Sequence, residues 1–132
     1  MTVTPRADTL LLVEDDESLR RILARHLRGL GYSVAEADSA EAATEALRGG
    51  LRPSLVLLDV NLPGDTGWDL LRGPDLASAG SPPVVIASAV TVSPRRLAEF
   101  RCAGYLPKPF AIQTLVDTVG RAIHPAPIED AL

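Results

Sequence analysis

The chain has 132 residues, the size of a single domain, and 46% of them are hydrophobic, as in folded globular proteins. Acidic residues outnumber basic ones by 17 to 13, and the net charge of −4 argues against direct nucleic-acid binding. The single cysteine, Cys102, excludes an internal disulfide. No apolar run is long enough for a membrane helix or a signal peptide, so we expect a cytoplasmic protein without a membrane partner.

The first half of the chain alternates short apolar runs with amphipathic stretches. The apolar run 9–13 predicts a strand, and the amphipathic stretch after it predicts a helix that ends at Gly31. A second strand is predicted over residues 32–36, and a second helix follows it. The apolar run 54–58 predicts a third strand, which leads directly into Asp59.

The second half continues the same alternation. A short third helix is predicted over residues 68–72, followed by a loop with room for one more helical turn. Residues 84–87 predict a fourth strand, and a fourth helix runs from Pro94 to about Cys102. Tyr105 and Leu106 mark a short fifth strand, and an apolar stripe predicts a fifth helix over residues 112–123.

Five strands that alternate with five helices predict an α/β fold with a doubly wound, five-stranded parallel sheet. We expect one domain over residues 9–124, an N-terminal tail over residues 1–8 and a flexible C-terminal tail over residues 125–132. The near-continuous apolar strands indicate a sheet that helices cover on both faces.

Polar residues stand where the predicted strands end, and they carry the candidate chemistry. They are Glu14, Asp15 and Asp16 after the first strand, Asp59 after the third, Ser88 after the fourth and Lys108, the chain's only lysine, after the fifth. Parallel strands place such residues at one edge of the sheet. Clustered carboxylates need a cation, and oxygen ligands suit Mg²⁺. An aspartate can accept a phosphoryl group, which a lysine and a hydroxyl would stabilise.

An alternative explanation applies to each residue taken singly. An acidic residue after a strand commonly caps the next helix, and a serine there is commonly part of a turn. Asp59 follows four apolar residues directly and fits these explanations less well. The combination therefore favours Mg²⁺-dependent phosphoryl transfer to an aspartate.

Four segments resemble the receiver domain of two-component response regulators. They are residues 11–17 (LLVEDDE), 57–64 with Gly67 (LLDVNLPG), 86–89 (IASA) and 105–110 (YLPKPF). The resemblance covers residues 10–123, with the motifs in order and near the family's spacing. It implies a flavodoxin-like fold with strand order 2-1-3-4-5. It also implies a bacterial phosphoprotein of a phosphorelay that is not an enzyme beyond its own phosphorylation and dephosphorylation.

The resemblance also implies roles around the metal. Asp59 is the implied phosphoacceptor. The implied ligands of Mg²⁺ or Mn²⁺ are Asp15, Asp59, the backbone carbonyl of Asn61 and, through water, Glu14. The spacing to Asp59 assigns the family's acidic pair to Glu14 and Asp15, which leaves Asp16 as the N-cap of the first helix.

Further roles concern the phosphoryl group and the switch. Ser88 and Lys108 are implied to bind the phosphoryl oxygens, and Ala89 leaves room for them. The bond between Lys108 and Pro109 is expected to be cis. Ser88 and Tyr105 are the implied switch residues, which move when the acceptor is phosphorylated.

The implied partners are proteins. A histidine kinase or phosphotransfer protein would donate the phosphoryl group, and a downstream protein would bind the face of the predicted fourth helix, fifth strand and fifth helix. We expect a monomer or weak dimer. Two alternatives stay open: the receiver piece of a longer regulator with an output domain, and a phosphorylation-independent binding module.

Three features depart from the family pattern or stand out beside it. The 20 positions from Ser88 to Lys108 are about two fewer than usual, which shortens the fourth helix or the loop before it. Val90 stands where some members carry a polar residue that helps to place the attacking water, so we expect slow self-dephosphorylation. Trp68 is interpreted as a packing anchor.

Overall fold

The computed structural model describes residues 8–62 and 66–124. The expected tails, residues 1–8 and 125–132, lie outside the described residues except for Asp8. The backbone carbonyl of Asp8 accepts the N–H of Ser33 at 2.9 Å, which joins this residue to the sheet.

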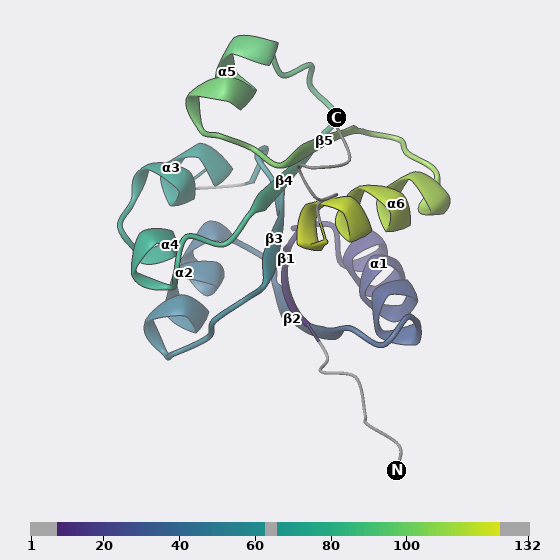
Figure 1. Cartoon of the computed structure of the whole chain (residues 1–132), viewed down its shortest axis with the longest axis horizontal. Helices are drawn as coiled ribbons and strands as arrows, with labels where there is room; N and C mark the ends of the chain where they lie inside the picture. Colours follow the sequence, from purple (N-terminus) through teal and green to yellow (C-terminus); the bar gives the residue numbers. More distant parts are fainter. Residues whose placement is uncertain (1–7, 63–65, 125–132) are drawn as a thin grey trace, which may run out of the picture.

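Five strands form one sheet in the order β2-β1-β3-β4-β5 (Figure 1), as predicted. Every neighbouring pair of strands is parallel, so all five carboxyl ends lie at the same edge of the sheet. The strands are β1 (Thr9–Val13), β2 (Ser33–Ala37), β3 (Leu55–Asp59), β4 (Val84–Ser88) and β5 (Gly104–Pro107).

Helices cover both faces of this sheet. Helices α1 and α6 pack on one face, and α2, α3 and α4 pack on the other (Figure 1). Helix α5 lies at the β4–β5 end of the sheet, beyond α3. The helices are α1 (Glu17–Gly29), α2 (Ala40–Arg48), α3 (Gly67–Arg72), α4 (Asp75–Ser78), α5 (Pro94–Glu99) and α6 (Ile112–Ile123). Within the described residues, every helix is too short or too polar to cross a membrane.

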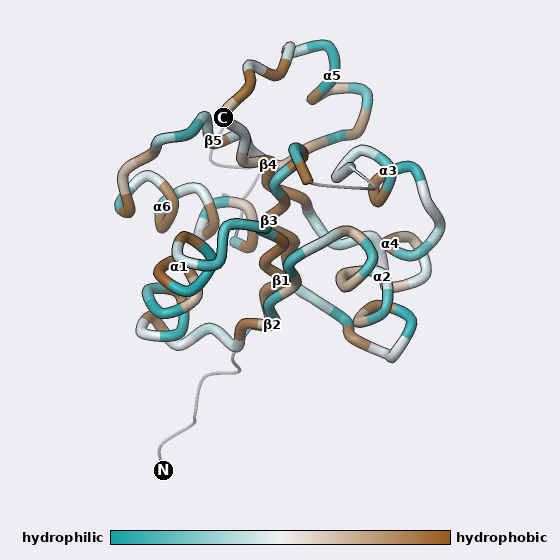
Figure 2. Tube along the Cα trace, turned by 180° about the vertical axis from the view of Figure 1, so that it is seen from behind, coloured by the Kyte–Doolittle hydropathy of each residue, from teal (hydrophilic) through white to brown (hydrophobic). Residues whose placement is uncertain are grey.

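The core has two layers, one on each side of the sheet. Along β1, Leu11 and Val13 face the layer under α2, α3 and α4, while Leu10 and Leu12 face the layer under α1 and α6. All four side chains are buried, and apolar residues line the strands at the centre of the molecule (Figure 2). Burial on both faces explains why the central strands are apolar at consecutive positions.

Local chemistry sets where two helices begin. Asp16 is the N-cap of α1, as predicted, and its side chain accepts the N–H of Leu19 at 3.0 Å. Ser93 caps α5, and Pro94 occupies the first position of that helix, where its missing N–H costs no hydrogen bond.

The helices differ from the prediction in two ways. The described residues contain six helices, because the loop that was expected to have room for one more helical turn forms that turn, α4, after Gly73 and Pro74, which follow α3. The predicted fourth and fifth helices are therefore α5 and α6. Helix α5 ends at Glu99, three residues earlier than expected. The backbone leaves the helical conformation at Arg101, whose φ is 52°.

Candidate functional site

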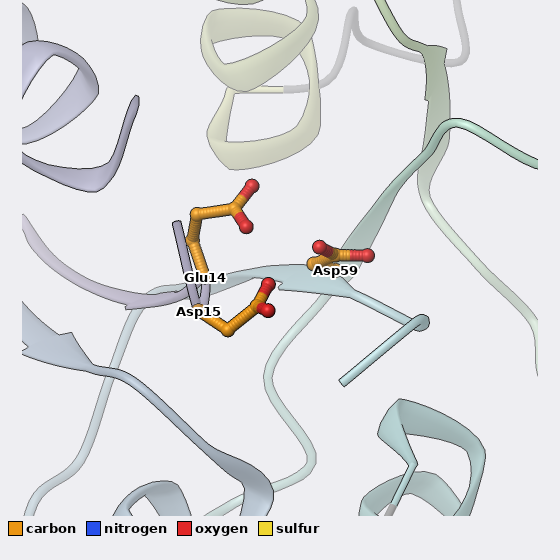
Figure 3. Close-up of side chains that lie close together, drawn as sticks. All are labelled: Glu14, Asp15 and Asp59. Atoms are coloured by element: carbon orange, nitrogen blue, oxygen red, sulfur yellow. The ribbon is translucent and has the colours of Figure 1, made fainter. Parts of the chain in front are cut away.

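Three carboxylates converge at the carboxyl edge of the sheet. Glu14 follows β1 and Asp59 ends β3, and these two strands are neighbours in the sheet. One oxygen from each of Glu14, Asp15 and Asp59 lies within 4.8 Å of the others (Figure 3). Glu14 and Asp59 are buried, whereas Asp15 is exposed. Glu14 and Asp59 are 45 positions apart in the sequence, and the parallel topology brings them side by side.

Lys108 reaches this cluster from the segment that follows β5. Its Nζ pairs with Glu14 Oε1 and lies 3.1 Å from Asp59 Oδ2. The ammonium therefore bridges two buried carboxylates that would otherwise repel each other. The peptide bond between Lys108 and Pro109 is cis, as expected.

Burial shifts the pKa values of both Glu14 and Lys108. It raises the pKa of Glu14 from its ordinary 4.5 to about 7, although hydrogen bonds from Lys108 and from the Asp16 N–H oppose the rise. Burial on its own would lower the pKa of the Lys108 ammonium, but contacts with Glu14 and Asp59 outweigh it and raise that pKa. Lys108 therefore stays charged between the two carboxylates.

Asn61 and Ser88 complete the surroundings of Asp59. The backbone N–H of Asn61 donates to Asp59 Oδ1 at 2.9 Å, so the two oxygens of Asp59 have different partners. The side-chain amide of Asn61 donates to the buried Ser88 Oγ at 3.1 Å, and the Val90 N–H donates to the same oxygen at 3.0 Å. The sequence motifs suggested a role for the backbone of Asn61, but they did not indicate this side-chain bond.

The other predicted residues lie around this centre. Tyr105 is half-buried in β5, and its hydroxyl accepts the N–H of Val92 at 3.3 Å. Ala89 and Pro109 line an apolar groove of about 390 Å³ between α1 and the start of α6, with Lys108 at its edge. The structure therefore brings Glu14, Asp15, Asp59 and Lys108 into one cluster and joins Asn61 and Ser88 to it through hydrogen bonds, whereas Ala89, Pro109 and Tyr105 lie outside that cluster.

Comparison with known proteins assigns a family to this arrangement. The family model for the response regulator receiver domain matches residues 10–120. The chain belongs to the response regulator receiver family. This receiver is 39% identical over 122 residues to the response regulator protein FleR of Pseudomonas aeruginosa, a match that covers 87% of this chain and 24% of FleR.

Other relatives place the receiver in the same family. It is 34% identical over 113 residues to the KDP operon transcriptional regulatory protein KdpE of Escherichia coli, covering 80% of this chain and 47% of KdpE. The solved non-phosphorylated receiver domain of HemR from Leptospira biflexa has a TM-score of 0.76 and 30% identity, covering 91% of this chain and 97% of that one. The receiver spans about a quarter to a half of the length of the curated relatives it matches.

The acidic cluster fits a hard divalent cation. Glu14, Asp15 and Asp59 supply oxygen donors only, and three carboxylates against the single ammonium of Lys108 leave a negative excess. Mg²⁺ takes a few carboxylates and keeps part of its water shell, which suits a site with one exposed member. These three residues therefore fit the ligand preferences of Mg²⁺.

Mg²⁺ should raise the thermal stability of the receiver, because it relieves the repulsion among these carboxylates. At 100 times its dissociation constant, a ligand that binds only the folded state adds about 2.7 kcal/mol. We expect Asp15→Asn to lose most of this gain and Asp38→Asn, which changes an exposed residue outside the cluster, to keep it. Thermal unfolding with and without Mg²⁺ measures the difference. Equal gains in the two variants would contradict a metal site at Asp15.

Proposed function

We propose that this receiver accepts a phosphoryl group on Asp59 from a histidine kinase or a phosphotransfer protein, with Mg²⁺, within a phosphorelay. The observation that carries the proposal is the pairing of Asp59 with two different donors. Its Oδ1 accepts the Asn61 N–H, and its Oδ2 faces the Lys108 ammonium. These contacts orient the carboxylate and place a positive charge where a transferred phosphoryl group would lie.

The reaction follows from these contacts. A carboxylate oxygen of Asp59 forms the new bond to phosphorus while the bond between phosphorus and the donor's imidazole nitrogen breaks. When bound, Mg²⁺ neutralises charge that builds up on the phosphoryl oxygens. Lys108 and the Ser88 hydroxyl stabilise the same oxygens from the protein side. The protein acts as a phosphoryl acceptor and turns over no other substrate.

The signal leaves through the surface that surrounds the site. Ser88 turns toward the phosphoryl group and Tyr105 follows, since both bond the backbone of the segment before α5. The face of α5, β5 and α6 then changes and selects a downstream protein. The relatives are longer than this chain, so such a target can be an output domain of the same regulator or a separate protein.

Asp59→Asn should abolish phosphorylation, because the amide oxygen is a poor nucleophile. After a small-molecule phosphodonor is added with Mg²⁺, intact mass should reveal one phosphoryl group on the native chain and none on the variant. Asp38→Asn should be modified like the native chain, and a chelator should prevent the reaction. Modification of Asp59→Asn at the native level would place the acceptor elsewhere. An unmodified native chain would favour the phosphorylation-independent binding module.

Val90→Glu should shorten the lifetime of the phosphoryl group by about tenfold or more, because a carboxylate can orient the attacking water and valine cannot. Val90 is 60% exposed and its backbone N–H bonds Ser88, so a longer side chain fits there beside the site. The decay of the phosphorylated form by intact mass measures the lifetime. Val90→Leu serves as the control and should keep the native lifetime. If Val90→Glu had the same lifetime as Val90→Leu, position 90 would have no part in orienting the attacking water.

A further inference from the structure

Helices α3 and α5 are joined by a cross-braced cluster of two rings and two arginines. The rings of Trp68 in α3 and Phe100 at the end of α5 lie 5.2 Å apart at 31°. The guanidinium of Arg96 in α5 lies 4.9 Å from the centre of the Trp68 ring, and that of Arg72 in α3 lies 5.5 Å from the centre of the Phe100 ring. Each helix region therefore supplies one ring and one arginine to the other. We call these four residues the α3–α5 brace.

Helix α5 has few other contacts that could hold it in place. It is six residues long, and none of its side chains is fully buried. A helix of this length is unstable unless it packs against the rest of the protein. Leu97 is half-buried against the core, and the brace supplies a second attachment. The position of α5 therefore depends strongly on the brace.

The segment before α5 connects the brace to the phosphorylation site. It is tied to the two proposed switch residues, since the Val90 N–H donates to Ser88 Oγ and the Val92 N–H donates to the Tyr105 hydroxyl. A cavity of about 260 Å³ runs beside this segment, with Asn61 and Ser88 among the residues that line it, and with Trp68 and Arg96 lining it as well. Residues of the brace and residues of the phosphorylation site therefore line the same cavity.

We propose that the α3–α5 brace holds α5 in the position of the unphosphorylated receiver and opposes the turn of Ser88 toward the phosphoryl group. The proposal rests on the proposed function. Ser88 Oγ accepts the N–H of Val90, so a turn of Ser88 toward Asp59 draws the segment before α5 along with it. That segment moves only if α5 moves with it, and the brace resists that movement. By linkage, a weaker brace makes the active arrangement easier to reach.

The test uses beryllofluoride, a mimic of the phosphoryl group, titrated calorimetrically into the Mg²⁺-loaded chain. Arg96→Ala should bind it about two- to fivefold more tightly, the change expected for the loss of one exposed cation–π contact. Arg95→Ala is the matched control, because Arg95 is an exposed neighbour in α5 outside the brace, and its affinity should stay native. Arg96→Lys keeps the cation and should fall between the two.

Trp68 emission provides an independent readout, since it is the chain's only tryptophan. Without any ligand, Arg96→Ala should alter this emission and Arg95→Ala should not. Beryllofluoride should move the native emission toward that of Arg96→Ala. Equal affinities in Arg96→Ala and Arg95→Ala, or weaker binding by Arg96→Ala, would overturn the proposal while leaving the proposed function intact. A native chain that binds no beryllofluoride would overturn the proposed function and the coupling with it.

Discussion

Replacing Lys108 with methionine should lower the free energy of unfolding of the metal-free receiver by about 3 kcal/mol at pH 8, the cost of breaking a buried ion pair. The side chains of Glu14 and Asp59 are 2% and 6% exposed, and Lys108 is the cation that pairs with both. Methionine retains the apolar stem but leaves two carboxylates facing each other without a counter-charge. Urea denaturation in a chelator measures the loss.

The loss should depend on pH in a defined direction. The pKa of Glu14 is about 7 in the folded chain and near 4.5 in the unfolded one, so the folded state binds more protons between these values. The contribution of Glu14 to the free energy of unfolding is therefore most favourable below pH 4.5, and it falls as the pH rises toward 7. Without Lys108, whose hydrogen bond lowers this pKa, Glu14 holds its proton to higher pH. The deficit of the variant should therefore be smaller at pH 6 than at pH 8.

Two comparisons separate this effect from a general loss of charge. Arg21→Met removes a surface cation whose side chain is 73% exposed and paired with Glu17, and such a pair contributes at most about 0.5 kcal/mol. Mg²⁺ should restore part of the stability of Lys108→Met, because it supplies the missing positive charge. A Lys108→Met deficit no larger than that of Arg21→Met would show that Lys108 does not compensate the buried carboxylates.

The strands and their polar ends could be predicted from the sequence because both are local patterns. Short apolar runs mark most of the strands, and parallel topology then brings Asp59 and Lys108 to one edge. The order of the strands came from the family resemblance, since apolar runs alone do not say which strand lies beside which. Asp16 was likewise predictable, because helix capping depends on a few consecutive residues.

Contacts between distant side chains could not be predicted in this way. Trp68 was expected to pack, but its partner Phe100 directly follows another helix, α5, and no spacing rule connects the two. The bond from the Asn61 side chain to Ser88 depends on the separation of β3 and β4 at their ends, which the motifs do not encode. The early end of α5 depends on the backbone at Arg101, a residue with no common preference for positive φ.

Gly67→Ala should destabilise the receiver by about 3 kcal/mol, at the upper end of the cost of overpacking. Gly67 is the first residue of α3, and its N–H bonds the carbonyl of Val60 at 3.2 Å. A Cβ on Gly67 would lie 2.7 Å from the Cα of Val60 and 2.9 Å from the carbonyl oxygen of Asp59. Both obstacles are backbone atoms, so no side chain can rotate away to make room.

The same crowding should affect function, because relief of the clash moves α3 away from the backbone of Asp59 and Val60. We therefore expect Gly67→Ala to slow phosphorylation of Asp59 as well as to lower the urea midpoint. Gly120→Ala is the matched control: Gly120 lies in α6 with nothing within 4 Å of an added Cβ, and alanine favours a helix over glycine by up to about 1 kcal/mol. Native stability and phosphorylation in Gly67→Ala would mean that α3 can shift without disturbing the acceptor, and the close packing of α3 on β3 would then have no part in positioning Asp59.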